Sequence, residues 1–214
     1  MGPNPFISMN DGVRLRLARS AEMNNQWTAH RTTLLGIRND PVRTNAGPGG
    51  GCSGMYSMAA AAFNALNRAP TDIDLDATAL ARYEPNAHMR FGMGYARKTR
   101  APNLYERYAW STHWITRGMI NWFGDGNYDV GKVDLKPEVA HTVSGTASWH
   151  GRTLKEWEVK VTPYQTYVRD YIDVNELATQ MQGMSTFSQL MLANHHARIW
   201  GADAGGIAAR KSKW

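Results

Sequence analysis

The side chains in this sequence that could bind a metal ion or perform catalysis are few and scattered. His195 and His196 are neighbours in a predicted strand, so their rings point to opposite faces and cannot hold one ion together. Cys52 is the only cysteine, which excludes an internal disulfide bond and a thiol-rich metal site. The sequence has no nucleophile elbow, His-Glu-x-x-His pair, Walker motif or carboxylate pair at catalytic spacing. We therefore expect no enzymatic activity, no cofactor and no resident metal.

Methionine is frequent, with 11 residues in the chain. Two pairs at x-x spacing, Met55 with Met58 and Met181 with Met184, fall in predicted loops. Thioether sulfurs are ligands that copper accepts, whereas methionine also fills ordinary apolar surface. The sequence favours the ordinary role and leaves the copper role open.

Aromatic and basic residues supply the candidates for ligand binding. An aromatic-rich segment in a predicted loop could contact a ligand or pack the loop on itself; it contains Tyr105, Tyr108, Trp110, Trp114, Trp122 and Phe123. Basic residues share the polar face of the predicted strands, where they would favour an anionic ligand or simply make the face polar; they are Arg14, Arg16, Arg82, Arg90, Lys98 and Arg100. The candidate ligand-binding residues are Arg90, Lys98, Arg100, Tyr105, Tyr108, Trp110, Trp114 and Trp122.

The elements that must position these residues are strands, because apolar and polar residues alternate with a period of two. In Val139–Trp149 the odd positions are mainly apolar and the even positions are small and polar, which places Val143 and Ser144 on opposite faces. The sequence predicts about seven strands. They lie in Val13–Leu17, Trp27–Ile37, Ile73–Glu84, Met89–Lys98, Val139–His150, Trp157–Thr162 and Leu190–Gly201.

The connections between these strands alternate in length. Short turns are predicted at Glu22–Asn25, Pro85–Ala87 and His150–Leu154, and long loops at Asn39–Asp72, Arg100–Pro137 and Asp173–Gln189. This rhythm is typical of transmembrane barrels, whereas a soluble β-sandwich has short turns at both ends. Aromatic residues of the apolar phase lie beside the short turns, where a membrane girdle would place them; they are Trp27, Tyr83, Trp149 and Trp157. The predicted fold class is therefore all-β, an antiparallel up-and-down transmembrane β-barrel segment that does not close alone.

Two motifs resemble the barrel of TonB-dependent receptors. The first follows a predicted strand and contains Arg100, Ala101, Pro102, Leu104 and Glu106; the second opens the next strand and contains Asp134, Leu135, Lys136, Pro137 and Glu138. Proline lacks the N–H that a strand ladder needs, so Pro137 suits a strand's first residue. Lys132 and Val133 depart from the Asn-Pro of the family pattern, so the turn before Asp134 is expected to differ.

The resemblance implies an outer-membrane receptor that imports a ferric siderophore or a related metal chelate. The implied partners are outer-membrane lipid, lipopolysaccharide, the chelate and, through a plug that this chain lacks, the TonB complex. Nucleic acid is not expected, because the net charge of +6 is spread along the chain. Residues 1–206 are predicted to be part of such a barrel and residues 207–214 a non-native or disordered tail. Without a plug, a signal peptide in Met1–Phe6 or enough strands to close, the chain is expected to be a fragment. The alternative is a soluble all-β ligand- or carbohydrate-binding module.

Overall fold

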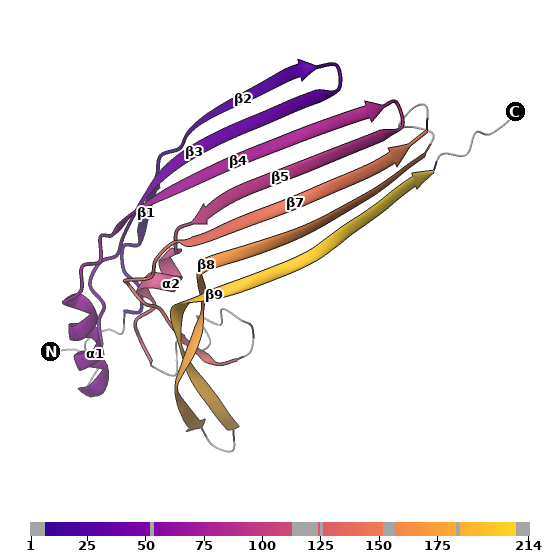
Figure 1. Ribbon diagram of the computed structural model, residues 1–214. Helices are drawn as coiled ribbons and strands as arrows, with labels where there is room; N and C mark the ends of the chain where they lie inside the picture. The colour runs from indigo at the N-terminus through magenta and orange to yellow at the C-terminus, as the bar shows by residue number, and fades with distance from the viewer. Residues whose placement is uncertain are drawn as a thin grey trace, which may run out of the picture.

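The protein forms one large β-sheet with two short helices at one end (Figure 1). The computed structural model describes residues 7–51, 54–112, 124, 126–151, 157–182 and 185–208. Its elements are β1 (Val13–Arg16), β2 (Arg19–Thr28), β3 (Arg31–Asn45), α1 (Gly54–Asn64), β4 (Thr71–Asn86), β5 (Met89–Arg100), α2 (Leu104–Tyr108), β6 (Tyr128–Val130), β7 (Glu138–His150), β8 (Trp157–Gln182) and β9 (Ser185–Ala208).

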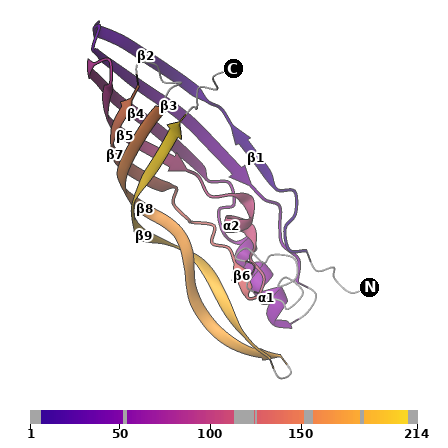
Figure 2. The ribbon, with the colours of Figure 1, turned by 90° about the vertical axis from the view of Figure 1, so that its right-hand side faces the viewer.

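The sheet is open and antiparallel apart from one short strand. The strand order is β1-β3-β4-β5-β7-β8-β9-β6, with β2 also paired to β3. β1 and β2 lie along the same edge of β3 and together take the place of one long strand. Figures 1 and 2 show a curved wall with β2 and β9 at its two margins. The predicted up-and-down barrel segment of about seven long strands is confirmed.

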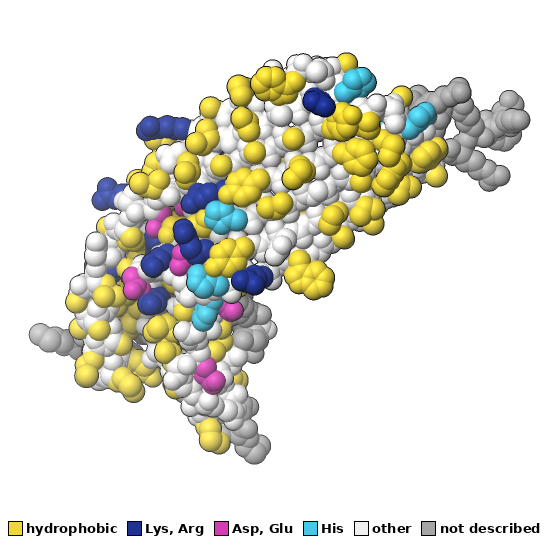
Figure 3. Space-filling model, in the orientation of Figure 1, with side chains coloured by type: hydrophobic (Ala, Val, Ile, Leu, Met, Phe, Trp, Pro, Cys, Tyr) yellow, Lys and Arg dark blue, Asp and Glu magenta, His cyan; other side chains and the backbone are white. Residues whose placement is uncertain are grey.

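Over most of the sheet, the register keeps one mainly apolar face and one mainly polar face. Met93 stands opposite Ala81 on one side and Gly145 on the other, and its side chain is 70% exposed. Val143 pairs with Tyr95 and lies on this apolar face, whereas Ser144 lies on the polar face. The predicted girdle residues Trp27, Tyr83, Trp149 and Trp157 are all exposed beside the short turns. The space-filling view shows the apolar side chains spread over the strands (Figure 3).

Two of the predicted connections are wrong. β2 runs through Glu22–Asn25 as far as Thr28, and the turn lies at residues 29–30. Glu22 pairs with Gly36 on the polar face, so its polarity marks a face and not a turn. The predicted loop Asp173–Gln189 is instead the end of a hairpin in which β8 and β9 continue to pair. β-Bulges after Arg169 and Glu176 shift the register there, which breaks the period-two pattern.

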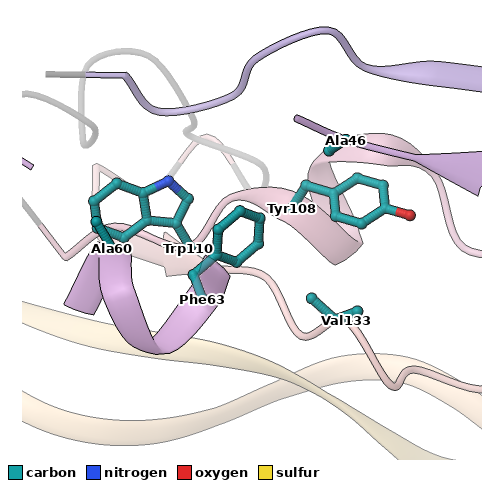
Figure 4. Packing of buried hydrophobic residues seen from close by; sticks show 6 residues of the cluster. All are labelled: Ala46, Ala60, Phe63, Tyr108, Trp110 and Val133. Carbon is teal, nitrogen blue, oxygen red and sulfur yellow. The ribbon is translucent and has the colours of Figure 1, made fainter. Parts of the chain in front are cut away.

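The long connections meet at one end of the sheet and form a small core there. α1 lies in the connection after β3 and α2 in the connection after β5. Their buried cluster consists of Ala46, Ala60, Phe63, Tyr108, Trp110 and Val133 (Figure 4). We call this end of the molecule the rim. β9 is described as far as Ala208, and the predicted boundary at residue 206 stays a prediction.

None of the helices among the described residues is long and apolar enough to cross a membrane.

Candidate functional site

Helix α2 begins at the rim, directly after β5, with a capping box. Asn103 is the N-cap: its side-chain oxygen accepts from the Glu106 amide at 2.9 Å, and Glu106 Oε2 accepts from the Asn103 amide at 2.7 Å. The two residues thus satisfy two backbone donors that a helix start leaves open. Pro102 precedes the cap and is fully buried. The first motif identified in the sequence therefore builds the transition from strand to helix.

Asn103→Ala is expected to weaken this helix start by about 1 kcal/mol, because one backbone donor loses its acceptor. Cleavage after the exposed Tyr105 by chymotrypsin should then accelerate about fivefold, since each 1.4 kcal/mol is a factor of ten. Asn103→Asp is the control, because its carboxylate can still accept the bond. Equal cleavage rates for the wild type and the alanine variant would contradict this role.

Arg100 and its two carboxylate partners tie four elements of the rim together. Arg100 Nη1 lies 2.9 Å from Glu106 Oε1, and its Nε lies 2.6 Å from Glu138 Oε2. The other oxygen of Glu138 accepts from the Ile172 amide at 2.8 Å. β5, α2, β7 and β8 are thus joined through one guanidinium and two carboxylates, a geometry in which charge-assisted bonds are strong. Arg100, which was also a candidate for ligand binding, uses its donors within the rim.

Arg107 and its neighbour Glu106 are the most deeply buried charges of the rim among the described residues. The Arg107 side chain is 1% exposed and that of Asp72 is 9% exposed. Nη2 of Arg107 donates to Asp72 Oδ1 and to the Leu135 carbonyl, each at 2.9 Å, and Nη1 donates to Thr44 Oγ1 at 3.0 Å. One side chain therefore connects α2 with β3, β4 and the segment before β7. Only a guanidinium offers a planar set of donors for so many acceptors.

Tyr108 and Trp110 pack the loop on itself, which is one of the two roles the sequence leaves open. Tyr108 is fully buried, and its hydroxyl lies 2.8 Å from Thr44 Oγ1 and 2.9 Å from the Arg68 carbonyl oxygen. Burial raises the pKa of the Tyr108 phenol. Trp110 stacks on Phe63 with ring centroids 6.1 Å apart (Figure 4). Tyr105 is half exposed. Trp114, Trp122 and Phe123 lie outside the described residues.

The second motif docks the loop onto the far edge of the sheet. Leu135 is buried against Ile172 and Leu192. The Asn194 side chain accepts from the Lys136 backbone amide at 2.9 Å and donates to the Lys136 backbone carbonyl at 3.0 Å. Pro137 directly precedes β7, and Asp134 is exposed. Lys132 is one of the two residues that depart from the Asn-Pro of the family pattern. Its backbone amide donates to the Glu106 carbonyl at 2.8 Å, which links the start of the second motif to the first motif.

The remaining polar-face cations that the sequence singles out mostly have acidic partners. Arg90 Nε lies 2.7 Å from Glu84 Oε1. Both residues lie beside the turn between β4 and β5, at the end of the strands opposite to the rim. Lys98 Nζ lies 3.3 Å from Asp76 Oδ2, and its side chain is 60% exposed. Arg16 binds the buried Asp40 carboxylate, as does Arg38. These pairs reduce the positive potential that the bare sequence suggests on this face.

The methionine pairs and the adjacent histidines are spread apart in the described part of the chain. Met55 and Met58 are 71% and 74% exposed on α1. His195 pairs with Tyr171 and His196 with Arg169, so the two rings leave different faces of β9. No group of three or more His, Cys, Asp or Glu residues comes together among the residues that the structure describes. Cys52 and Met184 lie outside those residues.

The chain is similar to several solved structures of known proteins. The chain is similar to the copper transporter OprC, with a TM-score of 0.64 at 14% identity, over 92% of this chain and 27% of that one. It is similar to a double mutant of the Serratia marcescens hemophore receptor HasR in complex with its hemophore HasA and heme, with a TM-score of 0.59 at 14% identity, over 90% and 31%. The siderophore receptor PirA from Pseudomonas aeruginosa gives a TM-score of 0.46 at 13% identity, over 90% and 39%.

The likenesses to OprC and HasR, at 14% identity, show the fold alone. The chain spans less than half the length of each of the three structures. The sequence matches no curated protein at a significant level. The family model for the TonB dependent receptor-like β-barrel, however, matches residues 10–214, which is nearly the whole chain. The strands, the two-faced sheet and the two rim motifs agree with that match. The chain belongs to the family of TonB-dependent receptor β-barrels.

Proposed function

We propose that this protein takes part in the uptake of a metal chelate, such as a ferric siderophore, across the outer membrane. In this proposal the described strands form part of the barrel wall, with the apolar face toward lipid and the polar face toward the lumen. The rim lies on the extracellular side, because long loops of such barrels face outward. The observation that carries the proposal is the match of the family model over residues 10–214.

The proposed ligand class rests on what related receptors carry and on which residues remain available here. The structural neighbours are named for copper, for heme with its hemophore and for a siderophore. Of the candidate ligand-binding residues, Tyr105 is 50% exposed at the rim, and Lys98 has a largely exposed ammonium group on the polar face. We propose these two as contacts for the chelate. Arg100, Tyr108 and Trp110 act instead by shaping the loop that presents Tyr105.

The soluble alternative fits the sheet poorly. Met93 is 70%, Val143 53% and Trp200 82% exposed, and all three lie on the same face. A continuous surface of large apolar side chains marks contact with lipid or protein and not with water. A carbohydrate-binding module would need polar residues around such aromatics.

Uptake in cells tests the proposal. A strain lacking the native open reading frame should lose import of radioactive iron supplied as a ferric siderophore under iron limitation. Deletion of the TonB gene should remove the same import. A parallel assay with radioactive copper identifies the cargo if it is copper. Unchanged uptake of both metals in the deletion strain, with the protein present in the parent's outer membrane, would overturn the proposal.

A further inference from the structure

Strands β4 and β5 separate near the rim, where side chains take the place of the backbone ladder between them. Their backbone register ends at the pair Ala77 and Arg97, whereas beyond this pair β4 continues along β3 and β5 continues along β7. We call the two stretches beyond this pair, Thr71–Asp76 and Lys98–Ala101, the seam. Because the loop that carries α2 begins directly at the seam, the contacts across it decide how firmly that loop is attached to the wall.

Two aspartates of β4 hold backbone amides across the seam. Asp76 Oδ1 accepts from the Thr99 amide at 2.8 Å. Asp74 Oδ2 accepts from the Ala101 amide at 3.0 Å. Thr99 Oγ1 also donates to the Leu75 carbonyl at 2.8 Å. Ala101 is 1% exposed and is the first residue after β5, so the bond from Asp74 fixes the point at which the loop with α2 leaves the wall.

Asp74 differs from the other carboxylates around it, because no ion pair among the described residues includes it. Asp40 stands directly opposite it in the register of β3 and β4. Asp72 and Asp76 lie two residues away on either side in β4 and share its face. The charged groups of the surrounding elements are paired with one another; the pairs are Asp40 with Arg16 and Arg38, Asp72 with Arg107, Asp76 with Lys98, and Arg100 with Glu106 and Glu138. Asp74 is thus surrounded by carboxylates without a cation of its own.

The buried carboxyl group of Asp74 has one oxygen without a donor. Asp74 is 4% exposed, and its Oδ1 has no hydrogen-bond partner among the described residues. An ionised carboxylate is an acceptor at both oxygens, and a buried charge without a partner costs so much free energy that the group keeps its proton instead. As a protonated group, Asp74 accepts from the Ala101 amide with its carbonyl oxygen and presents Oδ1 as a hydroxyl. In a directly opposed pair the Cβ atoms are about 5 Å apart, so the Asp40 carboxylate is close enough to accept from this hydroxyl.

We propose that Asp74 holds a proton at neutral pH and that this proton latches the loop with α2 to the wall. In the closed rim Asp74 is buried among carboxylates, whereas in an open rim, with Ala101 released from the seam, the group meets water and ionises as an ordinary aspartate does. The closed rim therefore binds the proton more tightly. By linkage, protons favour the closed rim, and closure is lost as the pH rises through the titration of Asp74 in the closed rim. The latch goes beyond the proposed uptake, since it requires neither a cargo nor TonB.

Infrared spectroscopy detects the proton directly, because a protonated carboxyl group has a carbonyl stretch apart from those of carboxylates and amides. The protein is produced from its native open reading frame and purified from outer membranes in dodecyl maltoside. At neutral pH the wild type should show this band, and the band should shift in heavy water. Asp74→Asn should lack it, since the asparagine side chain has nearly the same shape but no titrating proton. Asp76→Asn, on the same face of the same strand, is the matched control and should keep the band.

Hydrogen–deuterium exchange of the Ala101 amide measures the latch itself. Protection factors are compared, because they remove the intrinsic effect of pH on exchange. In the wild type, protection should fall by up to about tenfold per pH unit once Asp74 ionises, the limit for the release of one proton. In Asp74→Asn, protection should stay high at every pH, because the neutral side chain still accepts from Ala101. Asp76→Asn should keep the pH dependence of the wild type, and the amide of Met93, in the middle of β5, is the internal reference.

Asp40→Asn is a second variant for the case that Asp74→Asn does not reach the outer membrane. It removes the negative charge opposite Asp74 and leaves Arg16 and Arg38 in place, so the band should disappear at a lower pH than in the wild type. No band in the wild type at neutral pH, or a band equally strong in Asp74→Asn, would overturn the latch. Protection of Ala101 that depends on added calcium and not on pH would assign the site to a cation and overturn it as well. Metal uptake is measured on the same strains: a latch without uptake contradicts only the proposed function, and uptake without the band contradicts only the latch.

Discussion

Arg107→Met is expected to open the rim, at a cost of about 3–5 kcal/mol, because it leaves the buried Asp72 carboxylate without its cation. The methionine retains most of the side-chain length but none of the donors to Asp72, Thr44 and Leu135. Hydrogen–deuterium exchange of the Lys132 amide, which donates to the Glu106 carbonyl, reports this opening. Exchange should accelerate at least about a hundredfold, since each 1.4 kcal/mol is a factor of ten.

A double variant separates lost charge balance from lost packing. Arg107→Met combined with Asp72→Asn removes both charges, so the uncompensated carboxylate is gone and part of the protection should return. Amides in the middle of β5, such as that of Met93, serve as the internal reference. Exchange at Lys132 that is unchanged in Arg107→Met would show that the buried pair does not hold the rim.

Met93→Arg is expected to destabilise the membrane-inserted barrel by about 2–4 kcal/mol, the cost of an arginine near the bilayer midplane on a lipid-facing position. Met93 is suited to this test because it lies near the middle of β5, between the girdle beside the short turns and the rim. Val143, in contrast, lies only one outward pair below His141, so its replacement by arginine should have a smaller effect. Urea titration of folding in lipid vesicles measures the change.

Leu80→Arg is the matched control for Met93→Arg. Leu80 is 46% exposed and pairs with Gly94 on the polar face, where an arginine meets water and not lipid. It should change the midpoint of the urea titration little. A similar loss at both positions would mean that the assignment of the two faces to lipid and lumen is wrong.

The strands and their faces are predictable from the sequence because the bilayer imposes a strict alternation on them. Val139–His150 alternates at most of its positions, and β7 occupies that range to within one residue at its start. The alternation fails beyond Arg169. Asp170 has a positive φ of 56° at the first bulge of β8, and a second bulge after Glu176 shifts the register again. The sequence therefore predicts a loop at Asp173–Gln189 where the structure has paired strands.

The rim is less predictable, because its contacts join segments far apart in the chain. The two motifs mark Arg100, Glu106 and Glu138, but neither spacing nor periodicity indicates that Arg107 reaches Asp72 and Thr44. The one signal available is a basic residue inside a short helix that also begins with a capping box.

The pairing of β6 makes the rim depend on a strand far along the chain. Each long strand pairs with the long strand next to it in sequence, so the pairings of the wall itself are local. β6 precedes β7 in the chain yet pairs with β9, and Asn194 of β9 holds Lys136. The loop after β5 is therefore held at the far margin of the wall and not beside the strand that it follows. Closure of the rim thus depends on the last hairpin, because β6 and Lys136 both dock on β9.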